Sequence, residues 1–222
     1  GSDETVACFI SQRNVIRYLN NMRAYTDGYS DKTLRDILKG GRKDGVTTLL
    51  IESNFGDGIV AELFKKHMAQ TKQAVAIEET RANVRKEDRI IDTLEPVLNQ
   101  HRLVVDKSVI EWDYASNPDT APEKRLEYML FYQMSRMCRE KGAVRHDDRI
   151  DALAQGVQYF IDALSISAQQ EIITRRQKDW QDIITHWEDD IDCFANHMVF
   201  NMDMDQRRQS RGEAQNGVET WV

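Results

Sequence analysis

Three aspartates and a histidine gather in the short run VRHDDRIDALA, residues 144–154, where a segment with helical periodicity begins. Asp147 and Asp151 are four residues apart and Asp148 and Asp151 are three apart, so a helix would place them on one face. Hard cations such as Mg²⁺ prefer carboxylate oxygens as ligands. Acidic side chains also stabilise a helix N-terminus, with Asp147 as a possible cap. The run is therefore compatible both with a metal-binding cluster and with an ordinary helix start.

A further carboxylate stands where a sheet commonly presents its ligands. Glu52 ends the apolar run VTTLLIES and precedes the loop NFGDG, and open α/β sheets bind ligands beyond the carboxyl ends of their strands. A solvated strand end is the alternative interpretation. If Glu52 meets the aspartates, two cations about 3.5–4 Å apart could activate water and stabilise the leaving oxygen of a phosphodiester. The lone His146 is more typical of a polar helix entrance than of a proton shuttle.

Composition restricts the class of protein without naming it. The chain has 222 residues, 41% of them hydrophobic and 30% charged, which predicts one main domain. It has no apolar run near the roughly 20 residues that a membrane span requires, and its three cysteines show no paired spacing, which favours a reducing compartment. With a net charge of −7, contacts to nucleic acid would need a local basic patch. The candidates are Arg81, Arg85, Lys86 and Arg89, although a solvated helix face is the commoner meaning of such a run.

Strands and helices are expected to alternate along the chain, as in α/β folds. The sequence predicts a β-hairpin over residues 5–25 and a helix from Ser30 or Asp31 that stops at Gly40-Gly41. Further strands are expected at 46–53, 74–80 and 101–107, with helices within 54–70, 85–100, 125–140 and 146–164 and a loop at 117–124.

The chemical character changes near residue 168. We expect a folded domain over residues 1–167 and a helical extension over 168–200, in which Trp180 and Trp187 recur at helical spacing. Residues 201–222 are polar and are expected to form a flexible tail.

Four stretches occur in order along the chain: DGYSDKTL, ESNFGDGIVAELF, DTLEPVLNQHRLV and LFYQMSRMCREKGAVRHDDRIDALA. Together they resemble the nuclease half of the large terminase subunit, also called DNA maturase B, of short-tailed bacteriophages. The similarity runs from about Asp3 to about Leu164. It implies an RNase H-like fold, an α/β architecture with a mixed β-sheet flanked by helices. It also implies metal-dependent cleavage of concatemeric double-stranded viral DNA during head filling.

The resemblance also implies which residues would act. The family's strand-end acidic residue falls on Glu52, and its HDD motif falls on His146, Asp147 and Asp148, with Asp151 in the same signature. Glu52, Asp147 and Asp148 are expected to bind two Mg²⁺ or Mn²⁺ ions, with Asp151 as a further ligand. Asn54, Asp57 and His146 are expected to support the site. The implied partners are viral DNA, the portal protein, the small terminase subunit and an N-terminal ATPase domain, in the cytoplasm of the infected bacterium and without a membrane.

One departure from the family pattern leaves an alternative open. The family's first metal-binding aspartate lies on a strand before a Gly-rich turn that ends in DET, whereas this sequence starts at GSDET. We therefore expect a fragment without that aspartate. It could serve as a non-catalytic module that docks on DNA, the portal or the motor. A cellular resolvase or transposase nuclease of the RNase H class shares the carboxylates but not the surrounding motifs, and ranks last.

Overall fold

The structure is a computed structural model that describes residues 4–52, 58–81, 84–117 and 120–215. The chain divides into two compact units, Gly1–Ala163 and Leu164–Val222. The predicted boundary near residue 168 lies close to this division. The first unit contains the strands and all the predicted site residues.

A mixed three-stranded sheet begins with the predicted hairpin. Strand β1 (Thr5–Arg13) pairs antiparallel with β2 (Ile16–Tyr25), and the register shifts between Phe9 and Ile10. Strand β2 also pairs parallel with β5 (Leu103–Val105). A second sheet is formed by the parallel strands β3 (Thr48–Glu52) and β4 (Ala76–Thr80). The predicted strands are therefore confirmed.

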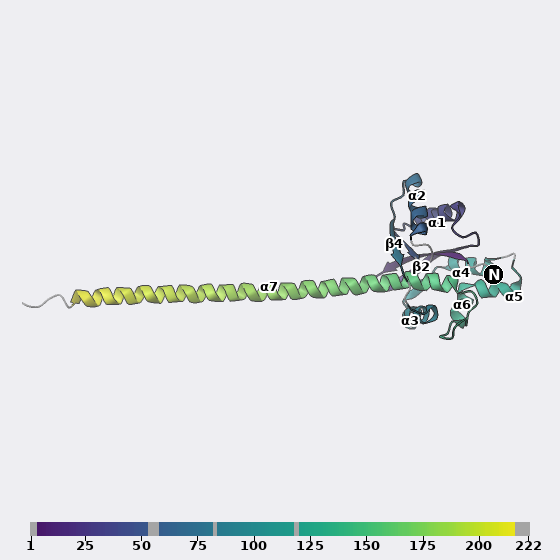
Figure 1. The fold of residues 1–222 in the computed structure, drawn as a ribbon. Helices are drawn as coiled ribbons and strands as arrows, with labels where there is room; N and C mark the ends of the chain where they lie inside the picture. The colour runs from purple at the N-terminus through teal and green to yellow at the C-terminus, as the bar shows by residue number, and fades with distance from the viewer. Residues whose placement is uncertain (1–3, 53–57, 82–83, 118–119, 216–222) are drawn as a thin grey trace, which may run out of the picture. The chain divides into compact units, whose positions relative to one another are not determined.

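Helices α1 (Asp31–Lys43) and α2 (Ile59–Thr71) cover one side of this arrangement (Figure 1). They share a buried apolar cluster with β3 that includes Leu34, Ile51 and Phe64. The Ser30 hydroxyl accepts a hydrogen bond from the Thr33 backbone N–H and caps α1, as expected.

The predicted end of this first helix at Gly40-Gly41 is wrong, because α1 continues to Lys43. A β-carbon on Gly40 would lie 2.9 Å from Cζ of the buried Phe9 ring. The glycine thus serves the close approach of α1 to β1 and does not end the helix.

On the other side of β2 lie α3 (Lys86–Asn99), α6 (Leu130–Arg136) and the start of α7 (Asp148–Gln215) (Figure 1). Their apolar side chains meet β2 in the larger core cluster. Its members are Leu19, Met22, Ile90, Leu94, Val97, Val109, Leu130, Ile150, Leu153, Ala154 and Val157.

The sequence analysis misjudged the region between β5 and α7. It missed α4 (Lys107–Ala115), which the Asp106 carboxylate caps, and it treated the short α5 (Pro122–Arg125) as loop. Helix α6 begins only at Leu130, after a 3-10 turn, because the Asp113 carboxylate accepts hydrogen bonds from the Leu130 and Phe131 backbone N–H groups. It ends at Arg136 instead of continuing to residue 140.

Helix α7 belongs to both units. In the first unit it packs closely on β1, because a β-carbon on Gly156 would lie 2.5 Å from Ile10 Cδ1. In the second unit the backbone stays helical to Gln215, where the sequence predicts a flexible tail from residue 201. The Gln, Arg, Glu and Met residues of that stretch have high helix propensity, which favours a helix although few of its residues are apolar. Among the described residues, no helix is long and apolar enough to cross a membrane.

Candidate active site

The carboxylates predicted to act together come from two elements that the fold joins. Glu52 is the last residue of β3, and Gln155 of α7 donates a hydrogen bond from Nε2 to Glu52 Oε2 (2.8 Å). Asp147 stands at the entrance of α7, because its carbonyl accepts the Asp151 backbone N–H (2.9 Å). We call Glu52, Asp147, Asp148 and Asp151 the carboxylate cluster.

Arg89 of α3 connects the β3 and α7 parts of this cluster. Its Nη2 donates to Asp151 Oδ1 (2.6 Å), and its Nη1 lies 3.5 Å from Glu52 Oε1. Both carboxylates therefore contact one guanidinium group. Burial raises the pKa of Asp151, and the positive charges of Lys86 and Arg89 offset this rise only in part.

Lys86, at the first turn of α3, contacts the same cluster. Its ammonium donates to Asp147 Oδ1 (2.7 Å) and lies 3.4 Å from Asp151 Oδ2. Burial disfavours the charged lysine, but the hydrogen bond that Lys86 donates to Asp147 and the charges of Asp151 and Asp147 outweigh it, so the pKa of Lys86 lies above its usual value. Two of the four predicted DNA-binding residues are thus engaged by carboxylates of the candidate site.

Arg81 and Arg85 lie in different surroundings. Arg81 is exposed, and Arg85 donates to the Arg139 carbonyl (3.2 Å) while lying 3.8 Å from Asp88. Contact of these residues with DNA stays a prediction.

Asp148 is held by a buried ionic network that the sequence analysis did not find. Its Oδ2 accepts the Glu4 backbone N–H (3.0 Å), and the Glu4 side chain accepts two hydrogen bonds from Arg149 (2.9 and 3.0 Å). Arg149 also donates to Asp113 Oδ1 (2.8 Å), and its guanidinium lies 4.9 Å from the centre of the Trp112 ring. The partners of Arg149 are 145 and 36 residues away in sequence, so no local pattern could have revealed the network.

His146 lies in an aromatic contact. It is buried, and its ring stacks on Tyr128 at a centroid distance of 4.0 Å. This contact fits the interpretation of His146 as a residue of the helix entrance. The other two predicted supporting residues, Asn54 and Asp57, lie outside the described residues.

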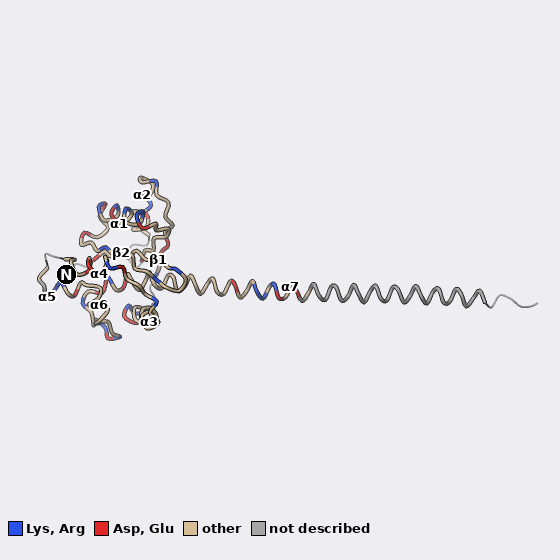
Figure 2. Tube along the Cα trace, turned by 180° about the vertical axis from the view of Figure 1, so that it is seen from behind, with Lys and Arg blue, Asp and Glu red and all other residues tan. Residues whose placement is uncertain are grey.

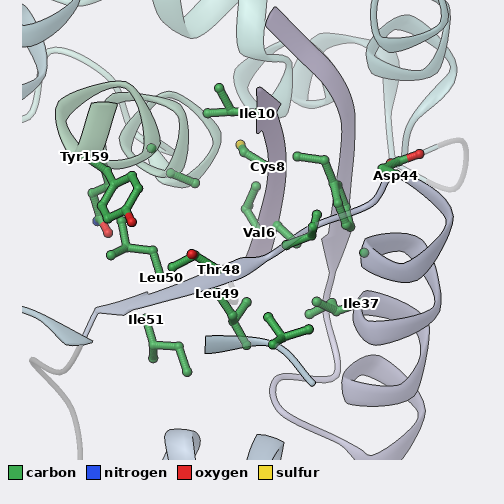
Figure 3. A pocket seen from close by; sticks show the side chains of 18 of the residues that line it. Val6, Cys8, Ile10, Ile37, Asp44, Thr48, Leu49, Leu50, Ile51 and Tyr159 are labelled. Carbon is green, nitrogen blue, oxygen red and sulfur yellow. The ribbon is translucent and has the colours of Figure 1, made fainter. Parts of the chain in front are cut away.

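The cluster opens onto a cavity of about 750 Å³ between β1 and β3. Figure 3 shows Val6, Cys8 and Ile10 of β1 facing Leu49 and Leu50 of β3 across it. Every residue from Glu4 to Gln12 and from Val46 to Glu52 lines the cavity, although successive strand residues point to opposite faces. The cavity therefore follows the edges of the two strands, and Glu52, Asp148, Asp151 and Lys86 line it as well.

Cys8 lies in the wall of this cavity, so the reactivity of its thiol tests how well the wall is shielded from solvent. Burial raises the pKa of the Cys8 thiol to about 12, against the opposing charge of Arg149. At pH 8 only about one thiol in 10,000 would then be the reactive thiolate. We expect iodoacetamide to modify Cys8 at least about 100-fold more slowly than the exposed Cys138, as measured by peptide mass spectrometry. Equal rates in the folded protein would show that the thiol is not shielded.

The donor atoms of the cluster suit a hard cation, but their arrangement is incomplete. All four side chains offer carboxylate oxygens, the ligands that Mg²⁺ and Mn²⁺ prefer. Among the described residues, however, no group of three or more His, Cys, Asp or Glu side chains lies close enough to hold one metal ion. The described residues therefore do not form a complete metal site by themselves.

Comparison with known proteins identifies the family. Residues 1–103 match the family model described as the ribonuclease H-like domain of the bacteriophage T7 terminase. The chain carries a terminase ribonuclease H-like domain. The predicted resemblance and the RNase H-like fold are thereby confirmed. The residues that match the terminase family model, 1–103, include Glu52, Lys86 and Arg89. The aspartates at the start of α7 lie after this matched range in the sequence.

A curated relative supports the same assignment. The large terminase subunit of Enterobacteria phage T3 is 44% identical to the chain over 174 residues. The match covers 76% of this chain and 30% of the phage T3 protein. The terminase domain thus spans less than a third of the length of that relative.

Proposed function

We propose that this chain is the nuclease region of a phage DNA-packaging terminase, which cuts concatemeric double-stranded viral DNA during head filling. The observation that carries the proposal is the guanidinium of Arg89, which contacts both Glu52 of β3 and Asp151 of α7. A strand-end glutamate and a cluster of helix-start aspartates thereby face one cavity in a terminase ribonuclease H-like domain.

In this proposal Glu52, Asp147 and Asp148 bind two Mg²⁺ or Mn²⁺ ions, with Asp151 as a further ligand. When bound, such ions would activate a water molecule and stabilise the leaving oxygen of the phosphodiester. The protein's own residues would set the geometry. Gln155 orients Glu52, and the backbone N–H of Glu4 orients Asp148. Lys86 and Arg89 limit the repulsion among the carboxylates before any cation arrives.

Arg81 and Arg85 are proposed to contact the DNA backbone. Phosphate contacts position a protein on DNA and carry no sequence information, so cleavage would show little sequence preference. The portal protein, the small terminase subunit and the N-terminal ATPase domain are the proposed partners, and the site of action is the cytoplasm of the infected bacterium.

A second candidate function follows from the incomplete ligand group. Because the described residues hold no group of three close metal-binding side chains, the chain alone could act as a module that docks on DNA, the portal or the motor. In that case the chemistry would depend on residues supplied from outside the chain.

Metal removal tests both candidates on a supercoiled plasmid. We expect the complete large subunit to cut the plasmid with Mg²⁺ or Mn²⁺ and to lose this activity in EDTA, because the carboxylates alone cannot activate water. Cleavage is read by gel electrophoresis. Undiminished cleavage in EDTA would contradict the proposal. The 222-residue chain is assayed alongside, and DNA binding without cleavage by this chain would favour the docking module.

A further inference from the structure

In the part of the second unit that the structure describes, large apolar side chains have nothing to pack on. In its described part, which is helix α7 alone, Ile166 is 55% exposed, Ile173 and Ile184 are each 53% exposed, and Trp180 is 66% exposed. None of these residues belongs to the carboxylate cluster or to the proposed DNA contacts, so the proposed nuclease function gives them no role. Exposed apolar side chains in such number commonly mark a protein interaction surface.

The spacing of these residues follows a heptad repeat. Ile166, Ile173 and Trp180 are separated by seven residues each, and Ile184 follows Trp180 by four. If the first three occupy d positions, Ile184 occupies an a position, and a and d residues together form one seam on a helix. Gln170 and Gln177 fill the two preceding a positions. We call Ile166, Gln170, Ile173, Gln177, Trp180 and Ile184 the α7 seam.

We propose that the α7 seam binds a second copy of this chain, as a parallel, in-register, two-stranded coiled coil. The sequence continues the same repeat beyond the described side chains, with Trp187 and Phe194 at d and Ile191 and Met198 at a. With these residues the sequence repeat runs over five d positions, and a coiled coil requires the repeat to persist over several heptads.

The polar residues of the seam favour an identical, parallel partner. In a parallel register each a-position glutamine meets its own counterpart, and the two amides can hydrogen-bond across the interface. In an antiparallel pairing, Gln170 and Gln177 would face apolar residues from the other half of the seam, and their buried amides would lack partners. A single polar a-position residue is known to fix register and strand number in coiled coils.

Few charged residues flank the α7 seam. Between Ile166 and Ile184 the flanking positions hold Ser167, Gln169, Thr174, Arg176, Gln181 and Ile183, so only Arg176 is charged there, and farther along the repeat the same positions include Glu188 and Asp190. The other charged residues of the described stretch lie away from the seam, and Figure 2 shows them along the α7 trace. They are Glu171, Arg175, Lys178, Asp179 and Asp182.

The large side chains of the seam contribute apolar area toward a dimer interface. A stable interface buries at least about 1,200 Å² in total, and two tryptophan side chains alone can bury about 300–500 Å². The isoleucines of the seam in both copies add to this area. Self-association would remove the surface that an isolated helix leaves in water.

Sedimentation equilibrium of the 222-residue chain tests the proposal. Between about 1 μM and about 100 μM, a range that brackets micromolar dissociation constants, we expect the mass to approach twice the 25.8 kDa of one chain. Ile173→Lys should raise the dissociation constant at least about tenfold, because it places two ammonium groups in an apolar seam. A chain that stays monomeric over the whole range would overturn the proposal and leave another protein as the partner.

Ile172→Lys is the matched control. Ile172 is the same residue type, adjacent in sequence and equally exposed at 53%, but it lies outside the seam. We expect Ile172→Lys to leave the dissociation constant unchanged, with circular dichroism confirming equal helicity in both variants. Equal effects of the two substitutions would refute the seam. Gln177→Ile should shift the assembly from two strands toward three or four, since isoleucine at both a and d favours larger coiled coils and a polar residue at a restrains the strand number. A mass that stays at two chains in this variant would refute the role given to Gln177.

Discussion

Replacing Arg149 with methionine is expected to lower the free energy of unfolding by about 3–5 kcal/mol, the usual cost of removing one partner from a buried ion pair. The Arg149 side chain is fully buried, and the carboxylates of Glu4 and Asp113 that it contacts are each only 2% exposed. Methionine would fill much of the volume but would leave two buried negative charges without their cation. The loss should appear as a fall of roughly 6–20 °C in the thermal unfolding midpoint.

A neighbouring arginine provides the control for this measurement. Arg145 is exposed, and its nearest carboxylate, Glu127, is 3.9 Å away. Arg145→Met is expected to change stability by less than about 1 kcal/mol, as for other exposed ion pairs. If the two substitutions destabilise the protein equally, the Arg149 network does not have the role assigned to it. Since Glu4 also positions Asp148, the Arg149 network connects the stability of the fold to the geometry of the carboxylate cluster.

Glu52→Gln should reduce DNA cleavage by the complete large subunit at least about 100-fold. Mutating a residue that only orients a metal ligand already lowers activity by up to about 100-fold, and losing the ligand itself should cost no less. The change keeps the size of the side chain and removes the charge that would bind a cation. Cleavage is followed as the rate of plasmid linearisation in Mn²⁺. Near wild-type cleavage by this variant would remove Glu52 from the site.

The matched control for Glu52→Gln is the same substitution at Glu62. Glu62 lies on α2, is exposed and pairs with Lys65 (2.7 Å), away from the carboxylate cluster. We expect Glu62→Gln to retain full cleavage. Equal thermal unfolding midpoints for the two variants would show that the loss at position 52 is chemical and does not arise from unfolding.

Much of the fold could be predicted because its signals are local. Alternation of apolar residues identified the β1–β2 hairpin, and the apolar run before Glu52 identified β3. Gly40 shows where local signals fail. A Gly-Gly pair usually ends a helix, but here the glycine accommodates the Phe9 ring, a contact between residues 31 positions apart in the sequence.

The candidate site was predicted in part, for a related reason. The possible metal-binding role of each acidic residue could be inferred from its place at a strand end or a helix start. The partners of Lys86 and Arg89 could not, since a run of basic residues does not show which surface it faces. The fold directs these two side chains to Asp147 and Asp151, and their engagement with carboxylates emerged only from the tertiary arrangement.

The cavity between β1 and β3 also affects how the protein would behave in concentrated solution. In the described part of the chain, β1 pairs only with β2 and β3 only with β4, so each strand has one edge whose backbone N–H and C=O groups form no ladder. Such edges are templates for pairing with strands of other molecules, and natural sheets usually protect them with charges, proline or covering segments. On β1 the apolar Val6 and Ile10 pack against the larger core cluster and place no charge at this edge. Aggregation of this protein would therefore be expected to begin at these two strand edges.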